Sequence, residues 1–256
     1  MDLKKKRQKA LIVFMTAGDP SLKKNEELIH SFEKEGVDLI ELGVPFSDPL
    51  ADGPVIQASS QRSLKRGTNL KKILQLVKNV RKKSQIPLVL MSYLNPIWHY
   101  GLKRFALKAH RAGVDGVIIP DLPPDEGKEI AAALKRRHLD LIYLMAPTST
   151  KARQKLVARQ SSGFIYYVSL TGVTGMKNKL SATLAAQVRS VKRNSRLPVC
   201  VGFGVSTPQQ AKVVSKTADG VIIGSSVVRA LDRHRNFSAD KISKKIIRPF
   251  VKALGD

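Results

Sequence analysis

The sequence has only one cysteine, Cys200, and a single cysteine excludes a disulfide within the chain. Cys200 lies in the apolar run 197–201, which favours a buried, unreactive thiol over a catalytic nucleophile. No apolar run approaches the ~20 residues of a membrane-spanning helix. The basic segment 4–7 precedes only a short apolar stretch, 10–15, without a small-residue cleavage site, so we expect no signal peptide. These absences fit a cytoplasmic protein with no membrane partner.

Acidic residues are scarce, since 20 Asp and Glu stand against 45 Lys and Arg, for a net charge of +25. Such an excess of positive charge is typical of nucleic-acid-binding proteins. The basic residues are spread over most helix-like segments, however, and such a spread is more typical of solvated helix faces. Aromatic residues, which stack on unpaired bases, make up only 5%. We therefore expect no nucleic-acid partner, and a nucleic-acid binder is the last of the alternatives.

Sequence patterns for metals and dinucleotides are missing as well. The five histidines are scattered without paired spacing and there is no Cys-x-x-Cys, so we expect no metal site. No Gly-x-Gly-x-x-Gly follows the first apolar run, which leaves a dinucleotide site without support. No lysine stands clearly at the end of an inner strand, and this weakens an aldolase mechanism through a Schiff base.

Short apolar runs alternate with amphipathic segments along the whole chain. The runs are nearly continuous in Val, Ile and Leu, as in parallel strands buried on both faces. We expect eight strands, at residues 11–14, 37–42, 87–91, 116–119, 140–145, 164–169, 197–201 and 220–223. Apolar spacings of three and four between them predict helices. These are expected at residues 22–35, 102–112, 125–137, 151–160, 180–193, 208–216 and 241–254, with a further stripe at Leu70, Ile73, Leu74 and Val77.

Eight strand–helix units over 256 residues average 32 residues each, which is the size of a βα repeat. The count favours a closed (β/α)8 TIM barrel over an open sheet, although periodicity alone does not prove closure. No linker or low-complexity segment interrupts the pattern, so we expect one α/β domain over residues 1–256. In such a barrel the active site lies at the carboxyl ends of the strands, and residues that follow the runs become candidates.

Two carboxylates occupy such positions. Glu41 ends the second run, and Asp52 follows eleven residues later in a loop rich in proline, glycine and aspartate. Two carboxyl groups in different environments can serve as an acid/base pair, because one is protonated while the other is ionised. As alternatives, Glu41 is a strand-end carboxylate paired with a lysine, and Asp52 is a turn former before Gly53.

Glycine-rich turns follow the last three strands. The run 202–206, Gly-Phe-Gly-Val-Ser, lets backbone amides approach a ligand, and Gly224-Ser225-Ser226 opens a short helix at 227–231. Together they predict a phosphate site at a helix N-terminus, although each alone could be an ordinary capped turn. The segment 171–175, Thr-Gly-Val-Thr-Gly, predicts either a lid over a ligand or a long surface loop.

The run 41–54, Glu-Leu-Gly-Val-Pro-Phe-Ser-Asp-Pro-Leu-Ala-Asp-Gly-Pro, is highly specific, and it resembles the signature of the tryptophan synthase alpha chain family nearly without departure. The similarity covers almost the whole chain in order. It continues at residues 14–20, 93–96, 121–123, 172–175, 202–204 and 224–225.

The resemblance implies retro-aldol cleavage of indole-3-glycerol phosphate to indole and glyceraldehyde 3-phosphate. It assigns the proton transfers to Glu41 and the stabilisation of charge at the indole N–H to Asp52. It further implies an indole pocket lined by Phe14, Tyr93 and Ile118, with Tyr166 close to Glu41. The remaining substrate-binding residues, which hold the phosphate or lie beside it, would be Thr174, Gly175, Phe203, Gly204, Gly224 and Ser225.

The family also implies a partner, the tryptophan synthase beta chain, in an alpha2-beta2 heterotetramer. The beta chain carries pyridoxal phosphate and receives indole through a tunnel, so we expect no cofactor in this chain. The residues expected to face it are Pro45, Asp48, Pro49, Asn95 and Pro96. The excess of positive charge departs from the family pattern.

Two further hypotheses of function stay open. One is a different phosphate-binding barrel, such as an isomerase of a phosphorylated sugar. The other is a chain that has lost turnover and acts mainly as an allosteric activator of the beta chain. The intact pair of carboxylates and the proline-rich loop at 41–54 favour the lyase over both.

Overall fold

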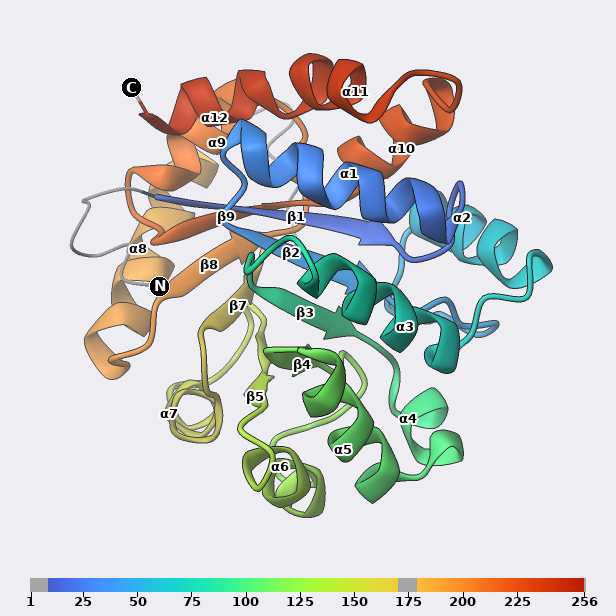
Figure 1. Ribbon diagram of the computed structural model, residues 1–256. Coiled ribbons are helices and arrows are strands. Elements are labelled where there is room, and N and C mark those ends of the chain that lie inside the picture. The colour runs from blue at the N-terminus through green and yellow to red at the C-terminus, as the bar shows by residue number, and fades with distance from the viewer. Residues whose placement is uncertain (1–8, 170–178, 256) are drawn as a thin grey trace.

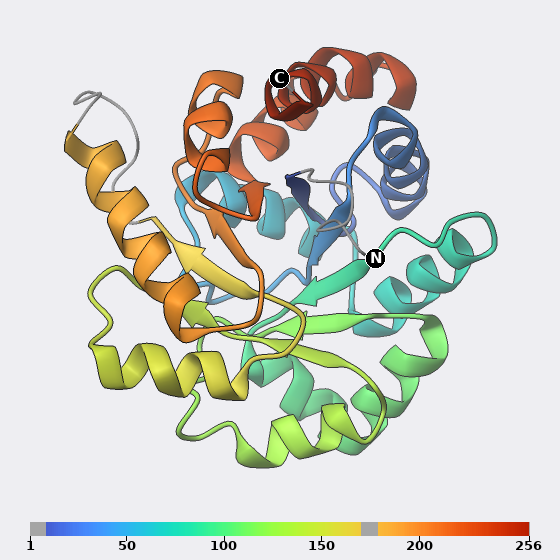
Figure 2. The same cartoon turned by 90° about the vertical axis from the view of Figure 1, so that its left-hand side faces the viewer.

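A computed structural model describes residues 9–169 and 179–255 of the chain. In this part of the protein, nine parallel strands form one sheet in the order β5-β4-β3-β2-β1-β9-β8-β7-β6, and the helices lie outside it (Figures 1 and 2). The strands are β1 Ala10–Thr16, β2 Leu39–Gly43, β3 Leu88–Met91, β4 Gly116–Ile118, β5 Asp140–Ile142, β6 Leu144–Met145, β7 Ile165–Val168, β8 Val199–Gly202 and β9 Gly220–Ile223.

The two ends of the sheet meet within one stretch of chain. The expected strand at 140–145 is divided at Tyr143, so that β5 pairs with β4 and β6 pairs with β7. The backbone N–H of Tyr166 donates to the carbonyl of Tyr143 at 3.3 Å. Because the chain itself joins β5 to β6, the sheet closes as a ring of eight strand positions. The predicted (β/α)8 barrel is confirmed, with its fifth strand in two pieces.

The helices begin and end close to the predicted positions in most units. They are α1 Leu22–Glu35, α2 Pro54–Lys65, α3 Leu70–Arg81, α4 Leu94–Tyr100, α5 Leu102–Ala112, α6 Lys128–Lys135, α7 Lys151–Gln160, α8 Lys179–Asn194, α9 Pro208–Ser215, α10 Ser225–Arg233, α11 Ala239–Ile246 and α12 Arg248–Gly255. None of the helices within the described residues is long and apolar enough to span a lipid bilayer.

Three features of the helices differ from the prediction. The sequence analysis missed α2 and α4, and it placed a single helix at 241–254 where the structure has α11 and α12. The helix breaks at Ile247 because Pro249 follows and has no N–H to continue the hydrogen-bond ladder. Pro249 instead lies in the first turn of α12, where a missing N–H costs little.

Two apolar layers hold the barrel together. The larger lies between the sheet and the helices, and the smaller fills the interior of the ring. Successive side chains of a strand point to opposite faces, so alternate residues enter each layer. On β1, Ile12 and Phe14 enter the interior layer, whereas Val13 and Met15 face the helices. The same alternation directs residue 41 of β2 inward.

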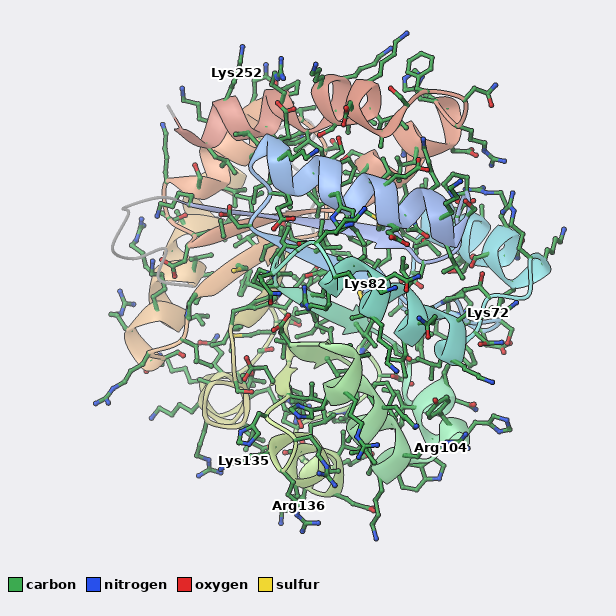
Figure 3. The ribbon with its side chains drawn as sticks, in the orientation of Figure 1. Lys72, Lys82, Arg104, Lys135, Arg136 and Lys252 are labelled. Atoms are coloured by element: carbon green, nitrogen blue, oxygen red, sulfur yellow. The ribbon has the colours of Figure 1, made fainter. Side chains whose placement is uncertain are left out.

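The basic side chains lie on the outside of the barrel. Figure 3 shows basic side chains extending from helices on all sides of the barrel. The labelled examples are on or directly after α3, α5, α6 and α12, and they are Lys72, Lys82, Arg104, Lys135, Arg136 and Lys252. The charge is therefore distributed around the molecule rather than gathered on one face.

Candidate active site

Glu41 lies inside the barrel, where no group among the described residues balances its charge. It occupies the middle of β2, in register with Phe14 on β1 and Val89 on β3, and its side chain is fully buried. Neither carboxylate oxygen has a hydrogen-bond partner among the described residues. Burial alone raises the pKa of Glu41 from 4.5 to about 8, because a charged form is poorly solvated there. No lysine of the described residues therefore pairs with Glu41.

Asp52 lies in a tight turn at the rim, where its backbone N–H donates to the carbonyl of Pro49 at 3.0 Å. Partial burial raises its pKa from 3.8 to about 6, and a hydrogen bond with the Tyr93 side chain opposes that rise. The Tyr93 hydroxyl also accepts from the backbone N–H of Ala51 at 2.8 Å. Tyr93, at the end of β3, therefore holds the loop after β2 in place, and Asp52 is both a turn residue and a perturbed acid.

The two carboxyl groups differ in charge at neutral pH. Burial raises the pKa of Glu41 to about 8, which favours its protonated form at pH 7. The pKa of Asp52 is raised only to about 6, which favours its ionised form at the same pH. One group can therefore donate a proton while the other stabilises positive charge, which is the division that acid/base chemistry on one substrate requires.

A cavity of about 340 Å³ opens at the carboxyl end of the barrel beside Asp52. It is lined by residues from the interior and from the loops after β2, β8 and β9. These are Phe14, Asp52, Gly53, Ile56, Met91, Tyr166, Phe203, Gly204, Val205, Ser206, Ile222, Gly224, Ser225, Ser226 and Arg229. Its volume suits a small molecule with an apolar body and a polar end.

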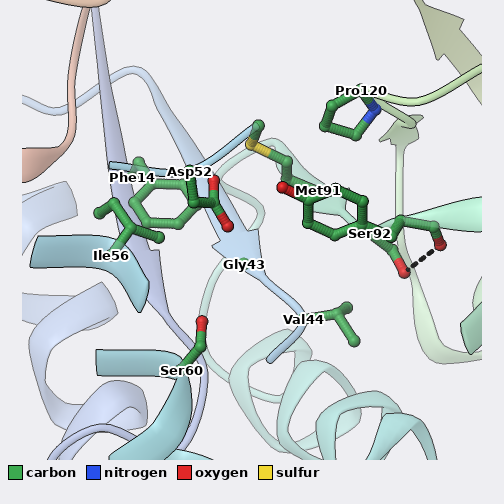
Figure 4. A pocket seen from close by; sticks show the side chains of 10 residues that line it. Phe14, Gly43, Val44, Asp52, Ile56, Ser60, Met91, Ser92 and Pro120 are labelled. Carbon is green, nitrogen blue, oxygen red and sulfur yellow. Dashed lines mark hydrogen bonds between the residues drawn. The ribbon is translucent and has the colours of Figure 1, made fainter. Parts of the chain in front are cut away.

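A smaller hollow of about 10 Å³, enough for a single water, adjoins the cavity. Figure 4 shows the Asp52 carboxylate in it among the side chains of Phe14, Ile56 and Met91. Tyr93 lines this hollow too, together with Gly43. A Cβ added at Gly43 would lie 2.5 Å from the tip of the Phe14 ring, so glycine at this position makes room for the ring.

Aromatic rings form one wall of the cavity. The rings of Tyr166 and Phe203 meet edge to face with centroids 5.9 Å apart. A Cβ at Gly202 would lie 2.5 Å from the Tyr166 hydroxyl, so this position also has to be glycine. The charge of Glu41 contributes to the strongly raised pKa of Tyr166, second to burial, so the two side chains are within electrostatic reach of each other.

The opposite end of the cavity is polar. Gly224 begins α10 without a side-chain cap, which leaves the first N–H groups of the helix open to an anion. Ser225 and Ser226 follow it, and the Ser226 hydroxyl is buried with no hydrogen-bond partner among the described residues. The left-handed backbone of Phe203 and Gly204, with φ of 65° and 78°, turns the loop after β8 along the same wall.

The structure therefore brings most of the expected site residues to one place. Six of them line the cavity with Asp52, namely Phe14, Tyr166, Phe203, Gly204, Gly224 and Ser225. Glu41 and Ile118 are buried in the barrel and line neither the cavity nor the smaller hollow. Thr174 and Gly175, like the rest of the expected lid at 171–175, lie outside the described residues.

Four residues of the cavity wall were not predicted from the sequence, namely Ile56, Met91, Ile222 and Arg229. The signal for Arg229 was its spacing, since a residue four positions after Ser225 lies on the same face of a helix. No three His, Cys, Asp or Glu side chains gather to hold a metal ion in the part of the chain that the structure describes.

Large apolar side chains are exposed on the rim beside the cavity. Leu50, in the loop after β2, is 95% exposed, and Trp98 on α4 is 57% exposed. The residues expected to face a partner lie in the same two segments, with Pro45, Asp48 and Pro49 in the loop of Leu50 and Asn95 and Pro96 on α4 with Trp98.

Comparisons with known proteins agree with one another. Residues 1–252 match the family model described as the tryptophan synthase alpha chain. Tryptophan synthase alpha chain of Geotalea uraniireducens is 50% identical, over 99% of this chain and 96% of the relative. That of Geobacter sulfurreducens is 49% identical, over 99% and 94%.

Solved structures show the same relationship. Tryptophan synthase subunit alpha of Legionella pneumophila superposes with a TM-score of 0.92 at 37% identity, over 99% of this chain and 95% of that one. A chain from the tryptophan synthase α2β2 complex of Pyrococcus furiosus gives a TM-score of 0.88 at 35% identity, over 96% and 99%.

Proposed function

Because the chain belongs to the tryptophan synthase alpha chain family, we propose that its cavity binds indole-3-glycerol phosphate and that Glu41 and Asp52 cleave it. The family's reaction is the retro-aldol cleavage to indole and glyceraldehyde 3-phosphate, and the chain is a carbon–carbon lyase of that family. The observation that carries the assignment of roles is the pair of carboxyl groups with separated pKa values, one inside the barrel and one at the cavity wall. We also propose that residues 1–256 act as one barrel domain.

Glu41 carries out the proton transfers. Protonation of indole C3 turns the ring into an indolenine that can accept the electrons of the breaking carbon–carbon bond. As that bond breaks, the adjacent hydroxyl of the glycerol chain loses its proton and becomes the aldehyde. A protonated carboxyl group can donate from one oxygen and accept at the other, so Glu41 can serve both steps. Its oxygens have no hydrogen-bond partner among the described residues, so the side chain can turn toward the cavity without breaking one.

Asp52 acts through its charge. Protonation at C3 places positive charge on the indole nitrogen, and an ionised carboxylate that accepts the N–H bond stabilises that charge. The effect is largest in a site from which water is excluded, where a single charge is screened least. Tyr93 supports this role because it holds Ala51 and Asp52 at the rim.

The substrate lies with its indole ring inward and its phosphate at the loops after β8 and β9. Phe14, Tyr93 and Ile118 contribute to the indole pocket, and Tyr166 lies between that pocket and Glu41. Phe203, Gly204, Gly224 and Ser225 bind the phosphate, together with Thr174 and Gly175 from the lid segment. The open N–H groups at the start of α10 support this orientation, because they favour an anion.

The partner is the tryptophan synthase beta chain in an alpha2-beta2 heterotetramer, and pyridoxal phosphate belongs to that partner. The α2β2 complex of the Pyrococcus furiosus relative supports the pairing. Leu50 and Trp98 support its location, because exposed apolar side chains beside the cavity suit a docking surface. A tunnel that starts there would receive indole directly. A cytoplasmic location is supported by the single, buried cysteine.

The experiment that tests this function is indole release from indole-3-glycerol phosphate by the purified chain, alone and with a tryptophan synthase beta chain. We expect slow release by the chain alone and a sharp rise on mixing. A folded sample that releases no indole in either case would contradict the proposal and bring forward the sugar-phosphate isomerase. Release only within the complex would still assign the lyase reaction to this chain and would show that its turnover depends on the partner.

A further inference from the structure

Arg229 stands out among the residues that line the cavity. It lies on α10, one helical turn after Ser225, and it shares the polar end of the cavity with Gly224, Ser225 and Ser226. Helical side chains lean toward the N-terminus of their helix, so Arg229 leans toward the turn that begins at Gly224. Among the described residues of the cavity wall, Arg229 is the only cation and Asp52 the only carboxylate.

A phosphate monoester needs more positive charge than the turns supply. It carries about −1.5 to −2 charges near pH 7, whereas a helix N-terminus contributes the equivalent of about +0.5. A guanidinium group adds a full charge and a planar set of donors that fits phosphate oxygens. The buried hydroxyl of Ser226, which has no partner within the described chain, supplies one more donor at the same place.

The other arginines near the end of α10 are placed differently. Arg235, in the turn after α10, forms an ion pair with Asp232. Arg233, one turn beyond Arg229, is exposed as Arg229 is, but it does not line the cavity. No ion pair joins Arg229 to a carboxylate within residues 9–169 and 179–255, so its charge is available to a ligand there.

We propose that Arg229, with Ser226 beside it, binds the phosphate group of the substrate and selects phosphorylated over unphosphorylated indole glycerol. The inference rests on the proposed function, because it names further ligands of the same substrate. Because Arg229 would contact the phosphate and not the carbon–carbon bond that breaks, it governs affinity for the substrate rather than the rate of the chemical step.

The test compares Arg229→Gln, Arg229→Lys and the matched control Arg233→Gln. The measurements are kcat and KM for indole-3-glycerol phosphate, and the calorimetric Kd for glycerol 3-phosphate. We expect Arg229→Gln to raise KM and Kd about 10- to 100-fold, because the phosphate loses a charged hydrogen bond. The value of kcat should stay within about threefold of the wild type. Arg229→Lys should recover part of the affinity, Ser226→Ala should weaken it a few-fold, and Arg233→Gln should match the wild type.

The outcomes separate this inference from the proposed function. Cleavage by the wild type with the same KM and Kd in Arg229→Gln would overturn the role of Arg229 and leave the lyase intact. Glycerol phosphate binding that depends on Arg229, in a wild-type chain that does not cleave the indole substrate, would support the anion site and contradict the lyase. An equal loss of affinity in Arg233→Gln would overturn the inference, because it would show a general effect of surface charge.

Discussion

Two buried carboxylates belong to neighbouring strand units, and their surroundings are opposite. Asp19, in the loop after β1, is 5% exposed and accepts hydrogen bonds from Ser59 at 2.7 Å and from Arg62 at 2.6 Å. Glu41, on β2, is fully buried and has no partner among the described residues. The Asp19 charge is neutralised inside the fold, whereas Glu41 is kept uncharged by its environment.

The contrast teaches how to tell a structural carboxylate from a reactive one. Burying an unpaired charge is expensive, so a carboxyl group in an apolar layer keeps its proton instead. A group that gains its proton in this way is ready to transfer it when a substrate arrives. Asp19 instead joins the loop after β1 to α2, and Arg62 extends that link to Asp232 on α10 at 3.6 Å.

The largest effect should come from Glu41→Gln. An amide cannot shuttle a proton, so we expect the rate of indole release to fall about 10³- to 10⁴-fold or more. Binding of glycerol 3-phosphate, measured by calorimetry, should stay within about twofold because the phosphate end of the cavity is unchanged. Turnover near the wild-type rate in this variant would show that Glu41 does not transfer the protons.

Asp52→Asn should cost less, about 10²- to 10³-fold in kcat/KM, because it removes a stabilising charge but no proton carrier. The pH dependence of kcat/KM gives a second test of this role. Wild-type kcat/KM should rise as Asp52 ionises near pH 6 and fall as Glu41 loses its proton near pH 8. In the variant the rise near pH 6 should disappear while the fall near pH 8 remains. Full activity in this variant would mean that Asp52 only shapes the turn.

The unpaired state of Glu41 also predicts a cost in stability that depends on pH. Between its ordinary pKa of 4.5 and its pKa of about 8 in the folded protein, the folded state holds a proton that the unfolded chain has lost. The free energy of unfolding of the wild type should therefore fall relative to Glu41→Gln by about 1.4 kcal/mol for each pH unit.

Urea denaturation of both proteins at pH 5.5 and pH 7.5 measures that difference, which should change by roughly 3 kcal/mol in favour of the variant. Above pH 8 the difference should level off. A difference that stays constant across this range would mean that Glu41 is as well solvated in the folded protein as in the unfolded chain.

Asp19→Asn should destabilise the fold and leave the activity nearly unchanged. Breaking a fully buried pair costs ~3–5 kcal/mol, and we expect about 2–3 kcal/mol here because Arg62 remains partly exposed. Activity per folded molecule should stay within about threefold. Asp232→Asn is the matched control: it removes the longer contact of Arg62 and the exposed ion pair with Arg235, and it should cost about 1 kcal/mol or less. A loss of activity comparable to that of Glu41→Gln would make Asp19 part of the chemistry.

The sequence predicted the barrel because its signals are strong and local. Helix α1 has the predicted bounds, since Ser21 caps its start and Gly36 ends it with a left-handed φ of 104°. Strand β9 also has the predicted bounds. Helix α2 was missed because its buried face is mostly serine, at Ser59, Ser60 and Ser63, which hides the apolar period. Helix α4 was missed because it is short and contains Pro96.

The site was predicted in part for a similar reason. The loop at 41–54 marks Glu41 and Asp52, and glycine-rich turns mark Gly204 and Gly224, so these residues can be found from local patterns. Glu41 has no partner among the described residues, whereas Asp19 has Ser59, Arg62 and Arg66. This difference depends on side chains that are far apart in the sequence. Arg229 could not be assigned to the cavity until α10 was placed beside the loop after β8.

The central claim is that Glu41 is protonated at neutral pH inside the folded protein. Infrared difference spectra of the wild type against Glu41→Gln, recorded across the pH range, isolate the carbonyl band of a single protonated carboxyl group. We expect a band that is present at pH 7 and disappears with a midpoint near pH 8. If the band instead has its midpoint near pH 4.5, it is already absent at pH 7. That result would show that Glu41 is ionised at neutral pH and would contradict the claim.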